Sequence, residues 1–304
     1  MAQLTGRTDL TALDDYIFAE LINARVIMAV QTPFVSLDVC LVDVIDGPSR
    51  VKAYPILSNI AAAAAVAETD EVSYTALASS EITVTATLKA SAAAVSDQSA
   101  GASIIDAYAS AIDRTINANL QKIESDALAL ITSISGSQGS NAIVNDFENY
   151  QSVMASVRAQ MKAPSQVAYI AHPDQMRDLR QDMVTNGAGL FGSAYGAQVA
   201  SQLGGVQQGA KGQALEPGVF LFETDGVPAG DSTGWAGAVV EMGAAPGLVL
   251  AYVPRRSGVA IQGGLMAVER DRLVSRMTEQ IVATADYGVA IHDQNRCYKF
   301  ISRT

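Results

Sequence analysis

Hydrophobic residues recur every three or four positions in several stretches of the chain, and this spacing predicts amphipathic helices. Such stretches span residues 9–30, 99–134 and 146–161. The middle stretch is the longest, and the glycines and serines from Ser135 onward end it. Its predicted buried face consists of Ile104, Tyr108, Ile112, Ile116, Leu120, Ile123, Leu130 and Ile134. A further helix should begin at Pro173, because proline suits the first turn of a helix.

Elsewhere apolar and polar residues alternate, which predicts strands. One strand is expected in VSLDVCLVDVI, after Pro33, and two more in SRVKAYPIL from Ser49 and EITVTATLKA from Glu81. The latter two would form an extended two-stranded flap, which is marginal in water unless it lies on another surface. Residues 269–291 should form one long half-buried strand, straight or bent, and RCYKFI a last short strand.

A regular alternation of strand and helix begins at Ser165. The stretch SQVAYIA predicts a buried strand that leads into the helix at Pro173. Residues 186–212 are rich in glycine and predict a loop, and the β-rich segments GVFLFETDGV and AGAVVEMGAAPGLVLAYV follow. The whole pattern indicates an α+β fold that contains an α/β insertion.

Composition limits the partners and the compartment. The 304 residues can bury a sizeable core, but only 6% are aromatic, so the core should be thin and neighbouring subunits should complete its burial. The 31 acidic residues outnumber 20 basic ones, and the net charge of -11 argues against tight sequence-specific binding of nucleic acid. Cys40 and Cys297 are far apart in sequence and favour a reducing compartment. No signal peptide or membrane span is expected.

One short motif suggests a cofactor. Gly187, Gly189 and Gly192 satisfy the G-x-G-x-x-G pattern of dinucleotide-binding loops, with Glu216 as a loose match for the acid that binds a ribose. That motif works when an apolar strand leads directly into it. Here the preceding DLRQDMVT is polar and helical, so a flexible loop is favoured over a nucleotide site.

Other candidate reactive residues lack the context that their chemistry needs. Lys211 is followed by glycine, so no phosphate-binding loop of the Walker type is present. Ser193 lacks the spacing of a nucleophile elbow, and only His172 or His292 could serve as its base. Each histidine is therefore interpreted as structural.

Metal ligands are not expected either. Two histidines and two cysteines without close spacing do not predict a zinc site, and the acids at positions 68, 70 and 71 lack the order of a calcium loop. The charged run over residues 269–276 fits either a strand edge protected by charge or ionic contacts between subunits. No catalytic, cofactor-binding or metal-binding residue is assigned.

The order of these elements resembles the major capsid protein of tailed bacteriophages, which has the Hong Kong ninety-seven-type fold also found in encapsulin shells. TVTATLKASAAAVSD with the helix after it is similar to the flap return and spine helix of that family. VAYIAHPDQMRDLRQDMVTNGAGLFG is similar to the strand, helix and loop that open its axial domain. The resemblance covers nearly the whole chain.

The resemblance implies a shell protein that forms pentamers and hexamers around a double-stranded DNA genome, in a virion assembled in the bacterial cytoplasm. It implies a portal protein, non-specific contact with packaged DNA and no cofactor. The flap has no lysine between Lys52 and Lys89, so covalent cross-linking is not expected, and the short arm implies a separate scaffolding protein.

The expected parts are 1–48 (arm and first strand), 49–95 (extended loop), 96–164 (peripheral domain with spine helix), 165–260 (axial domain) and 261–304 (peripheral domain with long strand).

Two alternatives remain open on the sequence. An encapsulin compartment that loads enzyme cargo would have the same fold, and fold alone does not choose between a compartment and a capsid. A dinucleotide-binding enzyme built around residues 187–192 would belong to a different class of protein.

Overall fold

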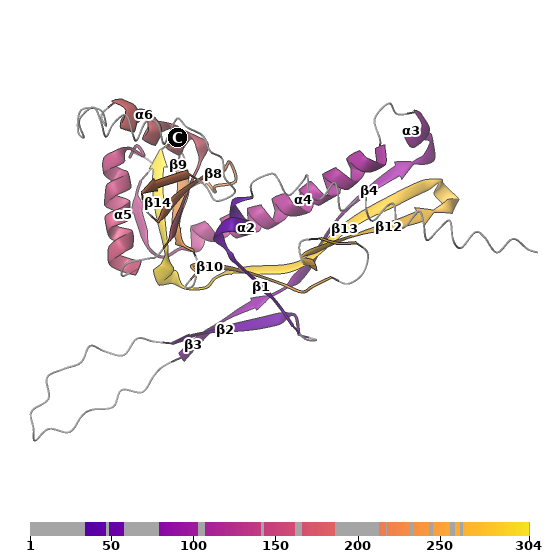
Figure 1. The fold of residues 1–304 in the computed structure, drawn as a ribbon, viewed down its shortest axis with the longest axis horizontal. Coiled ribbons are helices and arrows are strands. Elements are labelled where there is room, and N and C mark those ends of the chain that lie inside the picture. Colours follow the sequence, from indigo (N-terminus) through magenta and orange to yellow (C-terminus); the bar gives the residue numbers. More distant parts are fainter. Residues whose placement is uncertain are drawn as a thin grey trace, which may run out of the picture.

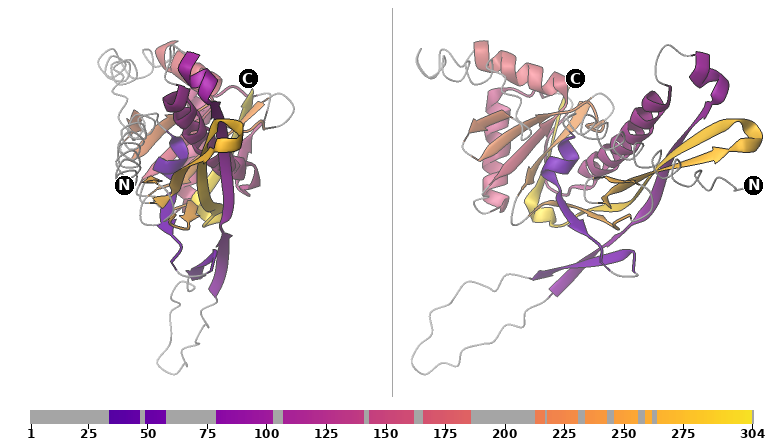
Figure 2. Two further views of the ribbon diagram at one scale, coloured as in Figure 1. Left: turned by 90° about the vertical axis from the view of Figure 1, so that its right-hand side faces the viewer. Right: turned by 45° about the vertical axis from the view of Figure 1, so that its right-hand side comes forward.

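Two six-stranded sheets, a two-stranded ribbon and one long helix form the described part of the protein (Figure 1). The second sheet and two helices form one end, the first sheet and the long helix extend away from it, and the ribbon projects to the side. The right-hand view in Figure 2 shows the same three parts. The computed structural model describes residues 34–46, 49–57, 79–102, 107–140, 143–161, 166–185, 213–216, 218–230, 234–242, 246–255, 259–261 and 264–303.

The first sheet is built around one long central strand. Its order is β1-β10-β13-β12-β11, and β4 also pairs with β13. Antiparallel pairing with β4 runs from Ser96 opposite Thr278 to Thr87 opposite Tyr287. The strands are β1 (Leu41–Val44), β4 (Thr87–Ser96), β10 (Leu248–Tyr252), β11 (Val259–Ile261), β12 (Met266–Leu273) and β13 (Thr278–Ile291).

The predicted long helix is confirmed as the element that covers this sheet; residues 103–106 of the predicted stretch, Ile104 among them, lie outside the described residues. Helix α3 (Asp97–Ala102) comes first, α4 (Ala107–Ala129) forms the main part, and a 3-10 turn η1 (Leu130–Ser133) ends it. The buried face predicted for α4 is correct, since Ile112, Ile116 and Leu120 are at most 1% exposed. Small residues of β13 lie in the same core, so helix and sheet can approach closely.

The segment after Pro33 differs from the prediction. Residues Val35–Val39 form a short helix, α2, and only the second half of the predicted strand becomes β1. Val35 and Val39 both enter the core beside α4, and the Ser36 N–H donates to the Glu124 carboxylate at 2.9 Å. Burial on α4 therefore overrides the β-branched run. The helix predicted over residues 9–30 lies outside the described residues.

The predicted two-stranded flap is confirmed. Strands β2 (Val51–Leu57) and β3 (Ser79–Thr85) pair antiparallel, with Val51 opposite Thr85 and Leu57 opposite Ser79. After Ala86 the chain continues directly into β4, which pairs with β13 instead of β2. Gly288 of β13 lies under this crossing, where a Cβ atom would be only 2.3 Å from the Thr85 carbonyl oxygen.

The single long strand predicted over residues 269–291 is wrong. The chain folds back on itself, and β12 and β13 form a hairpin in which Leu273 lies opposite Thr278. Their connection is a 3-10 turn, η3 (Val274–Arg276), followed by Met277 in the left-handed region with φ of 48°. The turn contains no glycine, proline, asparagine or aspartate, and Ser275 is its single residue of a type that favours turns.

The second sheet has the order β5-β14-β9-β6-β8-β7. Alternate residues of β6 face opposite sides: Tyr169 packs with α5 (Phe147–Met161) and α6 (Pro173–Thr185), whereas Ile170 belongs to the core that includes α4. Both helices confirm the sequence prediction. The strands are β5 (Ser137–Gly139), β6 (Val167–Ala171), β7 (Gln213–Glu216), β8 (Val219–Glu223), β9 (Gly234–Glu241) and β14 (Cys297–Arg303).

The sheets divide the chain differently from the boundaries expected at residues 164/165 and 260/261. Strand β14, near the carboxyl end, pairs with β9 in the second sheet, and β5 pairs with β14. In the other direction, β10 leaves the 165–260 segment and pairs with β1 and β13 of the first sheet. Non-local strand pairing of this kind leaves no signal in local periodicity.

Candidate assembly surfaces

Ionic and hydrogen-bonding contacts hold the base of the flap. Asp43 of β1 pairs with Lys52 of β2 at 2.8 Å and accepts a hydrogen bond from the Tyr54 hydroxyl at 2.9 Å. Burial raises the pKa of Asp43, but the hydrogen bonds from Lys52 and Tyr54 outweigh it and hold the pKa below its ordinary value. Burial, and then the hydrogen bond to Asp43, raise the pKa of Tyr54. The flap is therefore anchored to the first sheet at one end.

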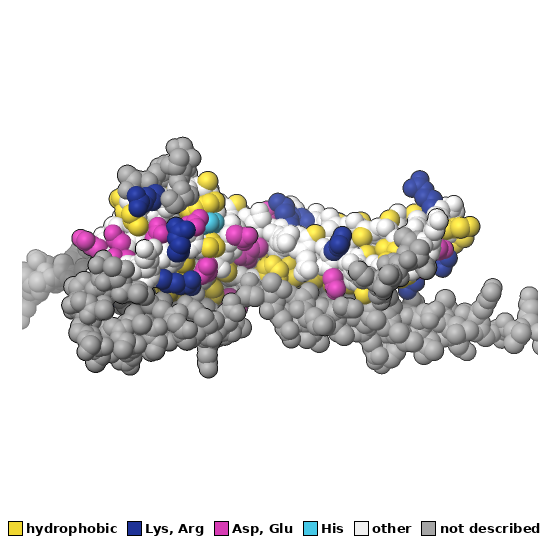
Figure 3. All heavy atoms as spheres, turned by 90° about the horizontal axis from the view of Figure 1, so that it is seen from above, with side chains coloured by type: hydrophobic (Ala, Val, Ile, Leu, Met, Phe, Trp, Pro, Cys, Tyr) yellow, Lys and Arg dark blue, Asp and Glu magenta, His cyan; other side chains and the backbone are white. Residues whose placement is uncertain are grey.

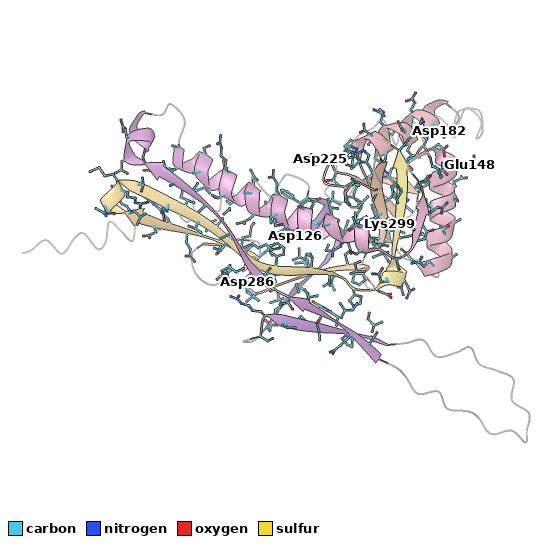
Figure 4. All side chains as sticks on the ribbon, turned by 180° about the vertical axis from the view of Figure 1, so that it is seen from behind. Asp126, Glu148, Asp182, Asp225, Asp286 and Lys299 are labelled. Carbon is cyan, nitrogen blue, oxygen red and sulfur yellow. The ribbon has the colours of Figure 1, made fainter. Side chains whose placement is uncertain are left out.

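A second ion pair ties the flap to the central strand. Asp286 of β13 is only 2% exposed, and its Oδ2 lies 3.3 Å from an Arg50 guanidinium nitrogen. Its other oxygen, Oδ1, has no hydrogen-bond partner in the described part of the protein. Figure 4 shows Asp286 where the ribbon meets β13. Since a buried carboxylate is costly without a partner, Arg50 helps to set the position of the flap.

A cluster on α4 joins the helix to the sheet. The Asp126 carboxylate forms ion pairs with Lys89 of β4 and Lys122 of α4. It also accepts a hydrogen bond from the Tyr287 hydroxyl of β13 at 2.9 Å. Burial raises the pKa of Asp126, but the hydrogen bonds from Lys122, Lys89 and Tyr287 lower it overall. The Asn119 side-chain amide also donates to the Ala283 carbonyl at 2.8 Å. These contacts specify how α4 lies on the sheet.

The free end of the β12–β13 hairpin exposes apolar and basic side chains together. Val274 is 76% and Met277 69% exposed. Behind them Arg270 contacts the buried Glu279 at 2.5 Å, and Arg272 contacts Asp97 of α3 at 2.9 Å. Figure 3 shows basic and hydrophobic side chains gathered at this end. The charged run over residues 269–276 thus lies on the hairpin, where its paired arginines support an exposed apolar tip.

Both histidines pack against aromatic side chains, and His172 Nδ1 also lies 3.3 Å from the Asp174 carboxylate. His172 stacks on Trp235 with ring centroids 3.8 Å apart, and its Nδ1 accepts the Asp174 N–H at 3.2 Å, at the start of α6. His292 packs edge-on against Tyr54 at 5.7 Å. Glu216 ends the edge strand β7. The predicted candidates at residues 187–192, Ser193, Lys211 and the acids at 68, 70 and 71 lie outside the described residues.

The two cysteines are free thiols buried in the same core. Burial, with a smaller contribution from Glu124, raises the pKa of Cys40 to about 12, and burial also raises the pKa of Cys297. Among the described residues, no group of three or more histidine, cysteine, aspartate or glutamate side chains could hold a metal ion. In the same part of the chain, no helix is long and apolar enough to span a membrane.

Sequence reasoning missed the residues that anchor the flap. Asp43 and Asp286 each lie within a strand pattern, and their partners, Lys52 of β2 and Arg50 just before β2, lie outside those strands. Only the Lys122–Asp126 pair, four residues apart on one helix, had a local signal. The anchoring contacts depend on strand pairing, which the local pattern does not specify.

Solved structures resemble this chain over almost its full length. The capsid protein of cyanophage P-SCSP1u matches with a TM-score of 0.64 and 10% identity, over 89% of this chain and 88% of that chain. The capsid protein of Helicobacter pylori bacteriophage KHP30 matches with a TM-score of 0.64 and 9% identity, over 86% and 88%. The SrpI encapsulin of Synechococcus elongatus matches with a TM-score of 0.57 and 13% identity, over 89% and 88%.

No protein-family profile matches the sequence, and no curated protein is similar enough in sequence to count as a relative. At identities of 9–13%, the structural matches establish the fold alone. The chain therefore has the Hong Kong ninety-seven-type fold of phage capsid proteins and encapsulins, which confirms the α+β fold expected from the sequence.

Proposed function

We propose that the chain is the major capsid protein of a tailed bacteriophage, which assembles through pentamers and hexamers into an icosahedral head around double-stranded DNA. The observation that carries the proposal is the length of the structural match, 89% of this chain and 88% of a phage capsid subunit. The flap of this chain projects from its compact parts. Shell subunits use such projections for contacts with neighbours, and many modest contacts add in a closed symmetric assembly.

The surfaces described above suggest how the parts divide this work. We assign the flap, the part of the expected segment 49–95 that precedes β4, to contacts over a neighbouring subunit. The peripheral domain would comprise the first sheet and α4, and the axial domain the second sheet with α5 and α6. This assignment keeps the expected parts 96–164, 165–260 and 261–304 in outline. Following the strand pairing, it moves β5, α5 and β14 to the axial domain, and β1, β4 and β10 to the peripheral domain.

The other partners follow from the proposed role. A subunit with net charge -11 would touch packaged DNA only through non-specific contacts. A portal protein and a separate scaffolding protein complete the proposed head, which would be assembled in the cytoplasm of the bacterial host. Efficient shell formation by the chain expressed alone would contradict the need for a scaffold.

An encapsulin-like compartment is the second candidate, favoured by the match to SrpI over 89% of this chain. It predicts that a cargo protein with a short docking tail co-purifies with the shell. A dinucleotide-binding enzyme is the least supported alternative and predicts cofactor retained by a small oligomer.

Electron microscopy of the purified protein, expressed with and without its neighbouring genes, tests the proposal, together with light scattering for particle mass. Hollow icosahedral particles are expected, and co-purifying cargo would indicate the compartment instead. A uniform dimer or tetramer under every condition would refute both shell functions.

A further inference from the structure

The tip of the β12–β13 hairpin, residues 274–277, carries the two most exposed large apolar side chains among the described residues, those of Val274 and Met277. Arg276, between them, is exposed as well. Figure 1 shows the hairpin reaching the opposite end of the molecule from the second sheet. Single exposed apolar residues are common on protein surfaces, so the conformation of the tip decides whether these two have a role.

That conformation is strained and firmly held. Met277 has a φ of 48°, and no other non-glycine residue in the described part of the chain has a positive φ. A methionine in the left-handed region is costly, whereas asparagine or glycine adopts it readily. The Asp97 N–H donates to the Met277 carbonyl at 3.0 Å, and the Asp97 carboxylate contacts Arg272 at 2.9 Å. The protein thus holds Met277 outward despite the strain, which is typical of functional positions.

A surface that could receive this tip lies on the face of the first sheet turned away from α4, here called the open face. Strand pairing aligns two neighbouring rows of side chains across β12, β13 and β4 on this face. The alanines of β4 and the carboxylates of β12 are exposed, and the β13 residues between them are half-buried. The rows are Glu269, Val282 and Ala92, and Asp271, Gln280 and Ala94.

The tip and the open face are complementary in shape and in charge. The tip projects long side chains, and the open face offers small side chains on which they can lie. Arg276 is positive, whereas Glu269 and Asp271 make one margin of the open face acidic. Both apolar side chains of the tip are exposed in the single subunit, so the tip does not pack on the open face of its own copy.

The other two arginines of the hairpin do not neutralise that acidic margin. Arg270 lies opposite Ile281, which faces α4 in the core, so Arg270 and Arg272 belong to the other face of β12. There they contact Glu279 and Asp97.

We propose that the tip of one subunit docks on the open face of a second copy of this chain, with Val274 and Met277 on the alanines and Arg276 beside Glu269 and Asp271. The contact rests on the proposed shell function, to which it adds a defined pair of surfaces. Since every subunit offers both surfaces, the contact can repeat around a symmetry axis.

The first test separates the strain at the tip from the contact. Met277→Asn introduces a residue that favours the left-handed region, so the variant subunit should unfold at the same or a higher temperature. Its association should nevertheless weaken by at least about tenfold, because burial of a methionine side chain contributes more than the free energy that corresponds to a factor of ten. Light scattering over a dilution series measures the concentration at which half of the purified protein has associated.

The second test reverses charges on the two surfaces. Arg276→Glu should weaken association by about tenfold or more, because it adds a negative charge beside the acidic margin, and Glu269→Arg/Asp271→Arg should do the same. Combining all three substitutions restores opposite charges and should recover most of the association. Arg114→Glu makes the same change of charge on an exposed position of α4. It is the matched control and should associate like the original protein.

Each variant is expressed with and without the neighbouring genes, and electron microscopy of the unaltered protein reports separately on the shell function. Unchanged association of Met277→Asn or Arg276→Glu, or no recovery with three reversed charges, would overturn the contact even where the unaltered protein forms normal particles. If the unaltered protein forms a small oligomer instead, the shell function fails, and the same variants decide whether the tip holds that oligomer together. An unaltered protein that stays monomeric in both expressions would overturn both proposals.

Discussion

Ile116 offers a direct test of how the long helix is packed. It is 0% exposed, lies in the middle of α4 and belongs to the core shared with β13. The substitution Ile116→Asp replaces a branched apolar side chain with a carboxylate at a position that water does not reach. The first sheet and the helix should then no longer pack together.

The expected cost follows from two contributions. Truncating a fully buried isoleucine costs about 2–5 kcal/mol, because it removes apolar contacts and leaves a cavity. Burying an unpaired carboxylate adds several kcal/mol to this loss of stability. If the carboxylate takes up a proton and becomes neutral but makes no hydrogen bonds, the added cost is nearly as large. The total of about 5 kcal/mol or more equals much of the stability of a typical domain, about 5–15 kcal/mol.

The assay compares Ile116→Asp with Ala118→Asp, which places the same carboxylate on the exposed face of the same helix. Soluble yield and thermal unfolding followed by circular dichroism should show loss of folding for Ile116→Asp and little change for Ala118→Asp. Normal particles and an unchanged melting temperature for Ile116→Asp would refute the packing described for α4.

Three further predictions concern the flap and the thiols. Arg50→Met should destabilise the protein by about 1–3 kcal/mol in a urea titration, because Asp286 loses its ion-pair partner, and adding Asp286→Asn should recover most of the loss. Burial raises the pKa of Asp43, but hydrogen bonds from its neighbours lower this pKa overall. The ionised Asp43 carboxylate therefore stabilises the folded protein fully when the pH is above the ordinary pKa of 3.8. This stabilisation is lost as the pH falls through the lowered pKa of the folded protein. Asp43→Asn should therefore flatten the acid side of a melting-temperature profile, and identical profiles would contradict this reasoning. Burial raises the pKa of both thiols, so Cys40 and Cys297 should resist iodoacetamide at about pH 8 until the protein unfolds; equal labelling rates in the folded and unfolded protein would show that they are accessible.

Local periodicity predicted the elements whose burial is decided within one stretch of chain. The apolar spacing around Ile116 placed the buried face of α4, the same reasoning located α5, and Pro173 marked the start of α6. The alternation in residues 49–57 and 81–90 predicted the flap, although the second strand of the observed ribbon, β3, is Ser79–Thr85 and the rest of the predicted stretch continues into β4.

The sequence by itself thus determined the α+β class, the long helix and the flap, since each depends on a local period of hydrophobic residues. Tertiary structure decided the helix at Val35–Val39, which forms because it packs on α4, and the hairpin turn at Met277, which has only Ser275 to mark it in the sequence. It also decided that β10 joins the first sheet and β14 the second. For the short helix and these two strands, the deciding contacts join residues distant along the chain, and no local pattern records which distant strand or helix a segment will meet.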